Sequence, residues 1–116
     1  HKEYNFIMNS KQILSKKLSE IRLAIEEMLE DKAIKHKVWN FGAYDIDPKY
    51  LVIVVGTETE IQKQELRSDK SFNESLKNLL EQFDWPEAAR EHVVFSIESQ
   101  EAVDKQSNGN WWYHYK

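Results

Sequence analysis

The first long pattern in the chain is a helical stripe between Ser10 and Asp31. Its apolar residues recur at spacings of three and four, the repeat of one face of an amphipathic helix. The stripe comprises Ile13, Leu14, Leu18, Ile21, Ile25, Met28 and Leu29. We expect a helix of about five turns, with Ser10 as its N-cap, because a serine hydroxyl accepts a hydrogen bond from an unpaired backbone N–H.

Two strand patterns follow, joined by a polar turn. Residues 36–44 alternate, with Trp39 and Phe41 on one side and Val38 and Asn40 on the other. Residues 50–56, YLVIVVG, are apolar on both faces, which is typical of a central strand covered on both sides. The intervening DIDPK (45–49) contains the Asp and Pro residues that favour turns. The segment therefore predicts a β-hairpin.

The second half of the chain predicts helices around a third strand. Residues 57–70 are highly charged, and we expect a helix or loop on the surface. Ser71 and Glu74 predict a capping box for a helix over about 72–83. One more turn follows at 84–90, with Pro86 at its first position. Residues 92–98 alternate as a strand, Ser99 caps a short helix to about Lys105, and a turn at SNGN precedes a terminal strand, WWYHYK.

These elements predict an α+β fold in the order α-β-β-α-β-α-β. The economical arrangement is a two-layer sandwich, in which a four-stranded, mostly antiparallel sheet has helices on one face and a partly open second face. The 116 residues suit one domain, which we place at 10–116. Residues 1–9 are interpreted as an N-terminal extension or the remnant of a tag.

Composition narrows the function classes. The net charge of −4 argues against nucleic acid, because nucleic-acid modules usually carry a basic stripe. The absence of cysteine excludes disulfides and thiolate chemistry. No apolar run reaches the roughly 20 residues that span a bilayer, and no signal peptide is visible. We therefore expect a cytoplasmic protein that binds neither membrane nor nucleic acid.

Catalytic and metal motifs are not evident. Asp45 and Asp47 could form a metal or general acid–base pair, but an Asx-type turn ahead of Pro48 explains them more simply. The histidines have no metal-ligand spacing, and no glycine-rich phosphate loop exists. His114 could face a pocket, although a hydrogen-bonding role among tyrosines is the commoner one. We expect no enzyme activity, cofactor or metal.

The terminal aromatic segment predicts a second functional feature. In a strand, Trp111, Tyr113 and Tyr115 would point to one face, and Trp112 and His114 to the other. One face would complete the core, and the other would form a docking surface. Base stacking on such a sheet is a weaker interpretation, since the basic surroundings of RNA-binding sheets are missing.

The segments AYDIDPKYL (43–51) and SQEAVDKQSNGNWWYHYK (99–116) resemble a group of small bacterial proteins of largely unassigned function. This group overlaps the immunity-type proteins that are encoded beside polymorphic or contact-dependent toxins. The resemblance implies a small, non-enzymatic protein that occludes the active site or an exosite of one toxin, and it carries no catalytic residues.

The resulting hypothesis is a surface that binds a protein partner such as a basic toxin domain, which an acidic surface would attract. Its candidate residues are Tyr44, Asp45, Asp47, Glu58, Glu60, Trp112 and His114. The chain would be a monomer or a weak homodimer. The alternatives are a small-molecule-binding or catalytic pocket on the open aromatic face and a structural homo-oligomer.

Overall fold

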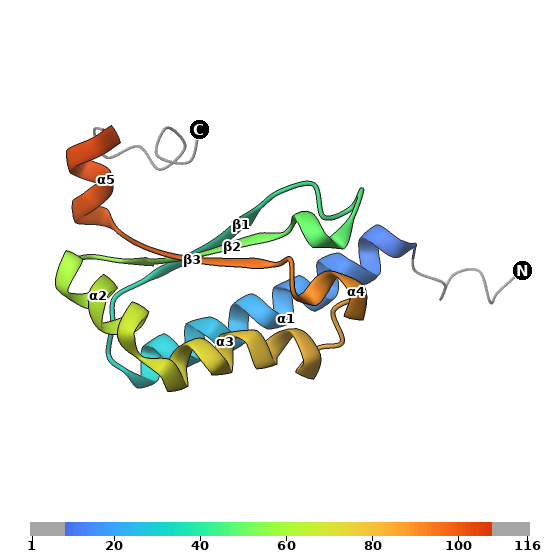
Figure 1. The fold of residues 1–116 in the computed structure, drawn as a ribbon, viewed down its shortest axis with the longest axis horizontal. Helices are drawn as coiled ribbons and strands as arrows, with labels where there is room; N and C mark the ends of the chain where they lie inside the picture. Colours follow the sequence, from blue (N-terminus) through green and yellow to red (C-terminus); the bar gives the residue numbers. More distant parts are fainter. Residues whose placement is uncertain (1–8, 108–116) are drawn as a thin grey trace, which may run out of the picture.

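Strand β2 (Val52–Thr57) lies at the centre of a three-stranded sheet in the order β1-β2-β3 (Figure 1). The computed structural model describes residues 9–107. Strand β1 (Lys37–Phe41) pairs antiparallel with β2, and β3 (Val94–Ser99) pairs parallel with it. The predicted mixture of helices and strands is confirmed, as is the central place of the VIVV run, in which Ile53, Val54 and Val55 are fully buried.

The parallel pairing of β2 and β3 differs from the mostly antiparallel sheet that we expected. Three helices connect these two strands: α2 (Glu60–Ser68), α3 (Lys70–Gln82) and α4 (Glu87–Arg90). A helical crossover returns the chain to the end of the sheet from which it started, so the next strand runs in the same direction. The charged stretch 57–70, for which helix and loop were both open, supplies α2.

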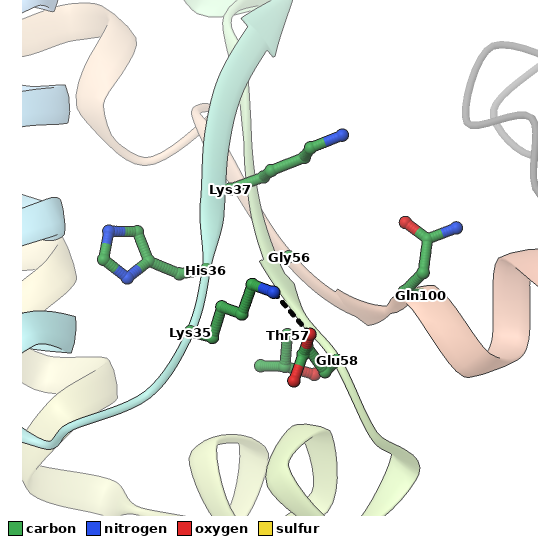
Figure 2. Close-up of a pocket in the computed structure, with 7 residues that line it drawn as sticks. All are labelled: Lys35, His36, Lys37, Gly56, Thr57, Glu58 and Gln100. Atoms are coloured by element: carbon green, nitrogen blue, oxygen red, sulfur yellow. Dashed lines mark ion pairs between the residues drawn. The ribbon is translucent and has the colours of Figure 1, made fainter.

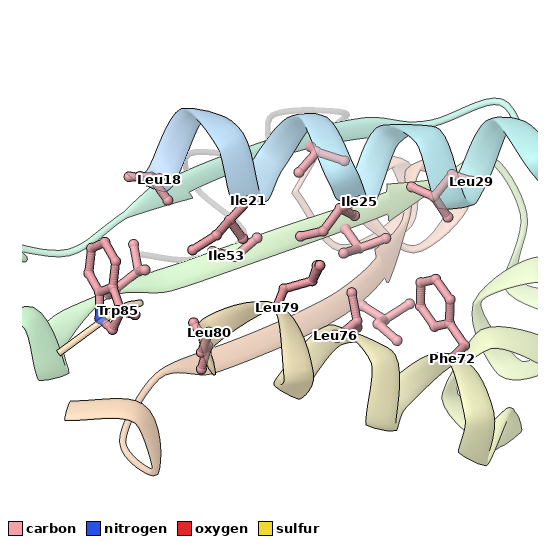
Figure 3. Packing of buried hydrophobic residues seen from close by; sticks show 14 of the residues in the cluster. Leu18, Ile21, Ile25, Leu29, Ile53, Phe72, Leu76, Leu79, Leu80 and Trp85 are labelled. Atoms are coloured by element: carbon pink, nitrogen blue, oxygen red, sulfur yellow. The ribbon is translucent and has the colours of Figure 1, made fainter. Parts of the chain in front are cut away.

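The helices α1 (Ser10–Asp31) and α3 cover one face of the sheet (Figures 1 and 3). Figure 3 shows Ile21 and Ile25 of α1 meeting Leu76 and Leu79 of α3 around Ile53. This layer buries most of the apolar residues of the predicted stripe, and such burial is the main stabilising contribution to a fold of this size.

Two predicted helix caps are wrong by one or two residues. Asn9, not Ser10, caps α1: its side chain accepts from the backbone N–H of Gln12, and the Gln12 side chain accepts from the Asn9 N–H. Asp69, not Ser71, caps α3 and accepts from the N–H of Phe72. Asn, Asp and Ser are nearly equivalent caps, so sequence alone does not discriminate between neighbouring candidates.

The short helix α5 (Gln100–Ser107) follows β3 directly and begins as predicted, because the Ser99 hydroxyl accepts from the N–H of Ala102. Ala102 and Val103 of this helix are buried outside the main core. The predicted terminal strand falls at 111–116 and lies outside the described residues. Within residues 9–107, none of the helices has the length and apolar character that a membrane span requires.

Candidate functional site

The connection between β1 and β2 is held in one conformation by its own backbone. The N–H groups of Ile46 and Asp47 both donate to the carbonyl of Ala43, at 3.0 and 3.1 Å. Asp47 caps the 3₁₀ helix η2 (Pro48–Tyr50) by accepting from the N–H of Lys49 at 3.0 Å. The predicted Asx-type turn is therefore the structural role of Asp47.

Glycine is required at the entrance to this loop. Gly42 has a φ of 98°, and a Cβ there would lie 1.9 Å from the carbonyl oxygen of Tyr50. No side chain fits at that distance, and L residues rarely adopt this backbone conformation. The close approach brings the two ends of the loop together.

Two aromatic residues fasten the loop to the helical layer. The Tyr44 hydroxyl lies 2.9 Å from the Ser15 hydroxyl of α1, and its ring lies 6.0 Å from that of Trp85 at a tilt of 58°. Trp85 is fully buried, and its indole N–H donates to the carbonyl of Pro48 at 3.2 Å. Tyr44, which we predicted as a contact residue, thus connects the loop to α1 and to Trp85.

The loop presents apolar side chains to solvent beside its carboxylates. Ile46 is 79% exposed and Tyr50 is 50% exposed. Asp45 and Asp47 are half-exposed, and among residues 9–107 their ion pairs are long, to Lys11 at 4.0 Å and to Lys49 at 3.9 Å. Such exposed pairs hold a carboxylate weakly. We call Asp45, Ile46, Asp47 and Tyr50 the loop surface.

A shallow hollow of about 330 Å³ adjoins the loop surface. It lies between η2 and α4 and is lined by Asp47, Pro48, Lys49, Pro86, Ala88, Ala89 and His92. The end of the molecule at which β2 begins therefore has both a protruding loop and a recess beside it.

The other predicted carboxylates lie at the opposite end of β2. Glu58 follows this strand and pairs with Lys35 at 3.3 Å. Six residues of strand separate it from the loop that contains Asp47, which corresponds to roughly 20 Å. The structure therefore does not bring Asp45, Asp47, Glu58 and Glu60 together into one small patch.

Glu60 belongs to an internal network at this second end. It accepts from the Ser99 hydroxyl at 2.6 Å and pairs with the ammonium group of Lys63 at 2.8 Å. Lys63 is buried and also reaches Glu98 at 3.5 Å. The hydrogen bond from Lys63, followed by that from Ser99, lowers the pKa of Glu60 below its ordinary value. The network joins the start of α2 to the end of β3.

A small cavity of about 130 Å³ opens beside this network (Figure 2). Its walls include Lys35 from the segment before β1, Lys37 from the start of β1, Gly56 and Thr57 from β2, and Gln100 from α5. Figure 2 shows Lys35 directed at Glu58 and His36 directed to the other side of the strand. His36 bonds through Nδ1 to the carbonyl of Ile34 at 2.8 Å.

The remaining predicted site residues, Trp112 and His114, lie outside the described residues. Among residues 9–107, no group of three or more His, Asp or Glu side chains is arranged to hold a metal ion. Comparison of the chain with protein-family models, curated proteins and solved structures gives no match. The geometry of the site therefore carries the functional argument.

The prediction of a covered strand over 50–56 is wrong for Tyr50, which ends η2 and is half-exposed. Ile46 was missed as a surface residue, because a single apolar residue within a turn belongs to no helix or strand repeat. Sequence reasoning also missed Arg22 and Arg67, which bond strand carbonyls from the flanking helices. The alternation of Ile46 with Asp45 and Asp47 was a usable signal, since a residue between two polar turn formers is often exposed.

Proposed function

We propose that this protein is a non-enzymatic protein-binding module of the immunity type, which neutralises a cognate toxin by covering its active site or an exosite. The observation that carries this proposal is the rigid loop surface. Ile46 projects from a loop that hydrogen bonds and two aromatic anchors hold in place. A binding loop that is already ordered loses little conformational entropy when it meets its partner.

The chemistry of the loop surface favours a basic partner. Asp45 and Asp47 flank the exposed Ile46 and are only weakly paired. An apolar anchor beside carboxylates suits a partner with an apolar pocket rimmed by Lys or Arg. The net charge of −4 also favours a basic partner, because it attracts a positively charged domain toward the protein.

Binding through side chains is favoured over binding by strand addition. Arg22 donates to the Val38 carbonyl on β1 at 3.3 Å, and Arg67 donates to the Ile97 carbonyl on β3. Both bonds engage the outer strands of the described sheet, where a partner strand would otherwise pair. On the loop surface, by contrast, the side chains of Ile46 and Tyr50 are open to a partner.

Several expectations from the sequence remain part of the proposal. Trp112 and His114 would add contacts from the terminal segment, which we still propose as a fourth strand, paired with an outer strand at positions that neither Arg22 nor Arg67 occupies. Glu58, at the opposite end of β2, would act through its charge in steering the partner, whereas Glu60 serves the internal network. The protein would act in the cytoplasm, as a monomer or weak homodimer, without a cofactor.

The test is a binding measurement with the product of the gene immediately upstream. That product, carrying an inactivating substitution, is titrated with the purified full chain in a calorimeter. We expect a one-to-one complex whose affinity falls as salt concentration rises. Absence of binding, together with no protection against the active form, would overturn the proposal.

A further inference from the structure

The connections at the carboxyl ends of β2 and β3 diverge. These two neighbouring strands are parallel, and each is followed by a helix. Figure 1 shows α2 on the side of α1 and α3, and α5 on the other side of the sheet. Where adjacent parallel strands send their connections to opposite faces, a crevice opens outside their carboxyl ends, and ligands of α/β sheets bind in such crevices.

The 130 Å³ cavity borders this crevice on the β1 side of β2 (Figure 2). Gly56 and Thr57 come from the end of β2, and Gln100 comes from the start of α5. Lys37 at the start of β1 and Lys35 just before it close the third side. Three separate elements thus contribute to one recess, which has room for a group of a few heavy atoms.

The cavity is cationic in a protein that is acidic overall. Two lysines and one carboxylate, Glu58, line it. Lys35 is paired with Glu58 at 3.3 Å. For Lys37, which lies beside Gly56 in the sheet, the structure shows no ion pair among residues 9–107. One positive charge of the cavity is therefore left without a carboxylate from the described part of the chain.

Two further carboxylates at this end of the sheet, Glu98 and Glu101, are already engaged. Glu98, the residue across Gly56 from Lys37, pairs with Lys63 at 3.5 Å and Arg67 at 3.6 Å. Glu101 accepts from the backbone N–H of Glu60 at 2.8 Å. Pairing Lys37 with Glu98 or Glu101 would break one of these bonds, whereas binding an anion would not.

We infer that this cavity binds a small molecule through a phosphate group. Lys37 and Lys35 would supply positive charge and N–H donors to the phosphate oxygens, whereas the Gln100 amide already donates to Asp104 Oδ1 at 2.9 Å and only lines the wall. Lysine is a common phosphate ligand because it acts as a mobile point charge. The site is distinct from the loop surface, since it lies at the opposite end of β2.

The test is a titration of the isotopically labelled full chain with sodium phosphate, followed by NMR. We expect saturable shifts of the backbone amides of Gly56, Thr57 and Gln100. Sodium chloride at matched ionic strength should leave these amides unshifted. Lys37→Gln should weaken the apparent affinity at least tenfold, which corresponds to loss of about one charge-assisted contact.

Lys49→Gln is the matched control, because it removes an exposed lysine from the opposite end of β2. It should leave the phosphate titration unchanged. Linear shifts equal to those with chloride, or shifts that persist in folded Lys37→Gln, would overturn the inference. A parallel titration with acetate tests the ligand class, and equal affinity for acetate would contradict a preference for phosphate.

Discussion

The guanidinium group of Arg67 on α2 donates two hydrogen bonds to the carbonyl oxygen of Ile97 on β3, at 3.0 and 2.6 Å. Ile97 is the register partner of Val55, whose other partner is Val38 on β1. The Val38 carbonyl in turn accepts from Arg22 of α1 at 3.3 Å. One row of the sheet is thus held at both of its outer strands by an arginine from a helix.

Removing the two hydrogen bonds from Arg67 to the Ile97 carbonyl should destabilise the sheet. Arg67→Met keeps the aliphatic part of the side chain and deletes both hydrogen bonds to Ile97. Hydrogen bonds from charged groups contribute more than neutral ones, so we expect a loss of about 1–2 kcal/mol in the free energy of unfolding. Urea denaturation measures this change.

Lys70→Met serves as the control for the Arg67 variant. Lys70 is an exposed cation on α3 with a single long ion pair to Glu74 at 4.0 Å. Its replacement should change stability by less than about 0.5 kcal/mol. Equal losses for both variants would show that charge, not the bond to Ile97, accounts for the effect.

Two positions with positive φ should respond to substitution in opposite directions. Gly42→Ala places a Cβ against the Tyr50 carbonyl and should cost more than about 2 kcal/mol. Ala33 follows α1 with a φ of 57° and is exposed. Ala33→Gly relieves the unfavourable left-handed conformation and should stabilise by about 0.5–1 kcal/mol. Thermal unfolding should show a lower melting temperature for Gly42→Ala and a higher one for Ala33→Gly than for the wild type.

Trp85 should be essential to the loop and the core alike. Trp85→Phe leaves the Pro48 carbonyl without its indole donor and reduces the buried volume. We expect a loss of about 2–3 kcal/mol in the free energy of unfolding. Faster hydrogen exchange at the amides of Lys49 and Tyr50 should accompany it, and unchanged exchange there would contradict the anchoring role.

Acid should weaken the junction between α1 and α3. Asp69 accepts from the N–H of Phe72, which is the main cause of its lowered pKa, and pairs with Lys32 at 3.0 Å. Because the folded pKa lies below the unfolded one, this stabilisation is present above the unfolded pKa and is lost as pH falls through the folded value. Asp69→Asn keeps a cap but removes the titration, so stability measured from pH 7 to pH 3 should fall less steeply than in the wild type.

The helix α1 and the central strand β2 could be predicted, because the spacing of their apolar residues matches a helix and a buried strand. The apolar repeat from Leu14 to Leu29 fits an amphipathic helix, whose buried face it forms. The VIVV run is apolar on both faces, and both faces of a strand are buried when it lies at the centre of a sheet. Strand direction had no such signal. The parallel pairing of Val52 with Val94 depends on the path of three helices, which no local pattern encodes.

The candidate site could be predicted less fully for the same reason. Asp45 and Asp47 were found from turn chemistry, but Glu58 was grouped with them although a whole strand separates them. The partner of Glu60 is Ser99, 39 residues away in the chain. A contact between residues so far apart depends on how the helices and strands pack, and not on any local sequence pattern. The sequence therefore could not show that Glu60 is internal whereas Asp45 and Asp47 lie on the surface.

The central claim is that the loop surface binds a protein partner, and Ile46 tests it most directly. Ile46→Asp and Ile61→Asp are compared, because Ile61 on α2 is also highly exposed, at 72%, but lies at the far end of the sheet. Both variants should fold, since each residue is mostly in solvent.

The deciding measurement is the dissociation constant of each variant for the inactivated product of the upstream gene. We predict that Ile46→Asp weakens binding at least a hundredfold, as expected for loss of a central apolar anchor, and that Ile61→Asp binds within about threefold of the wild type. Wild-type affinity in folded Ile46→Asp would contradict the account.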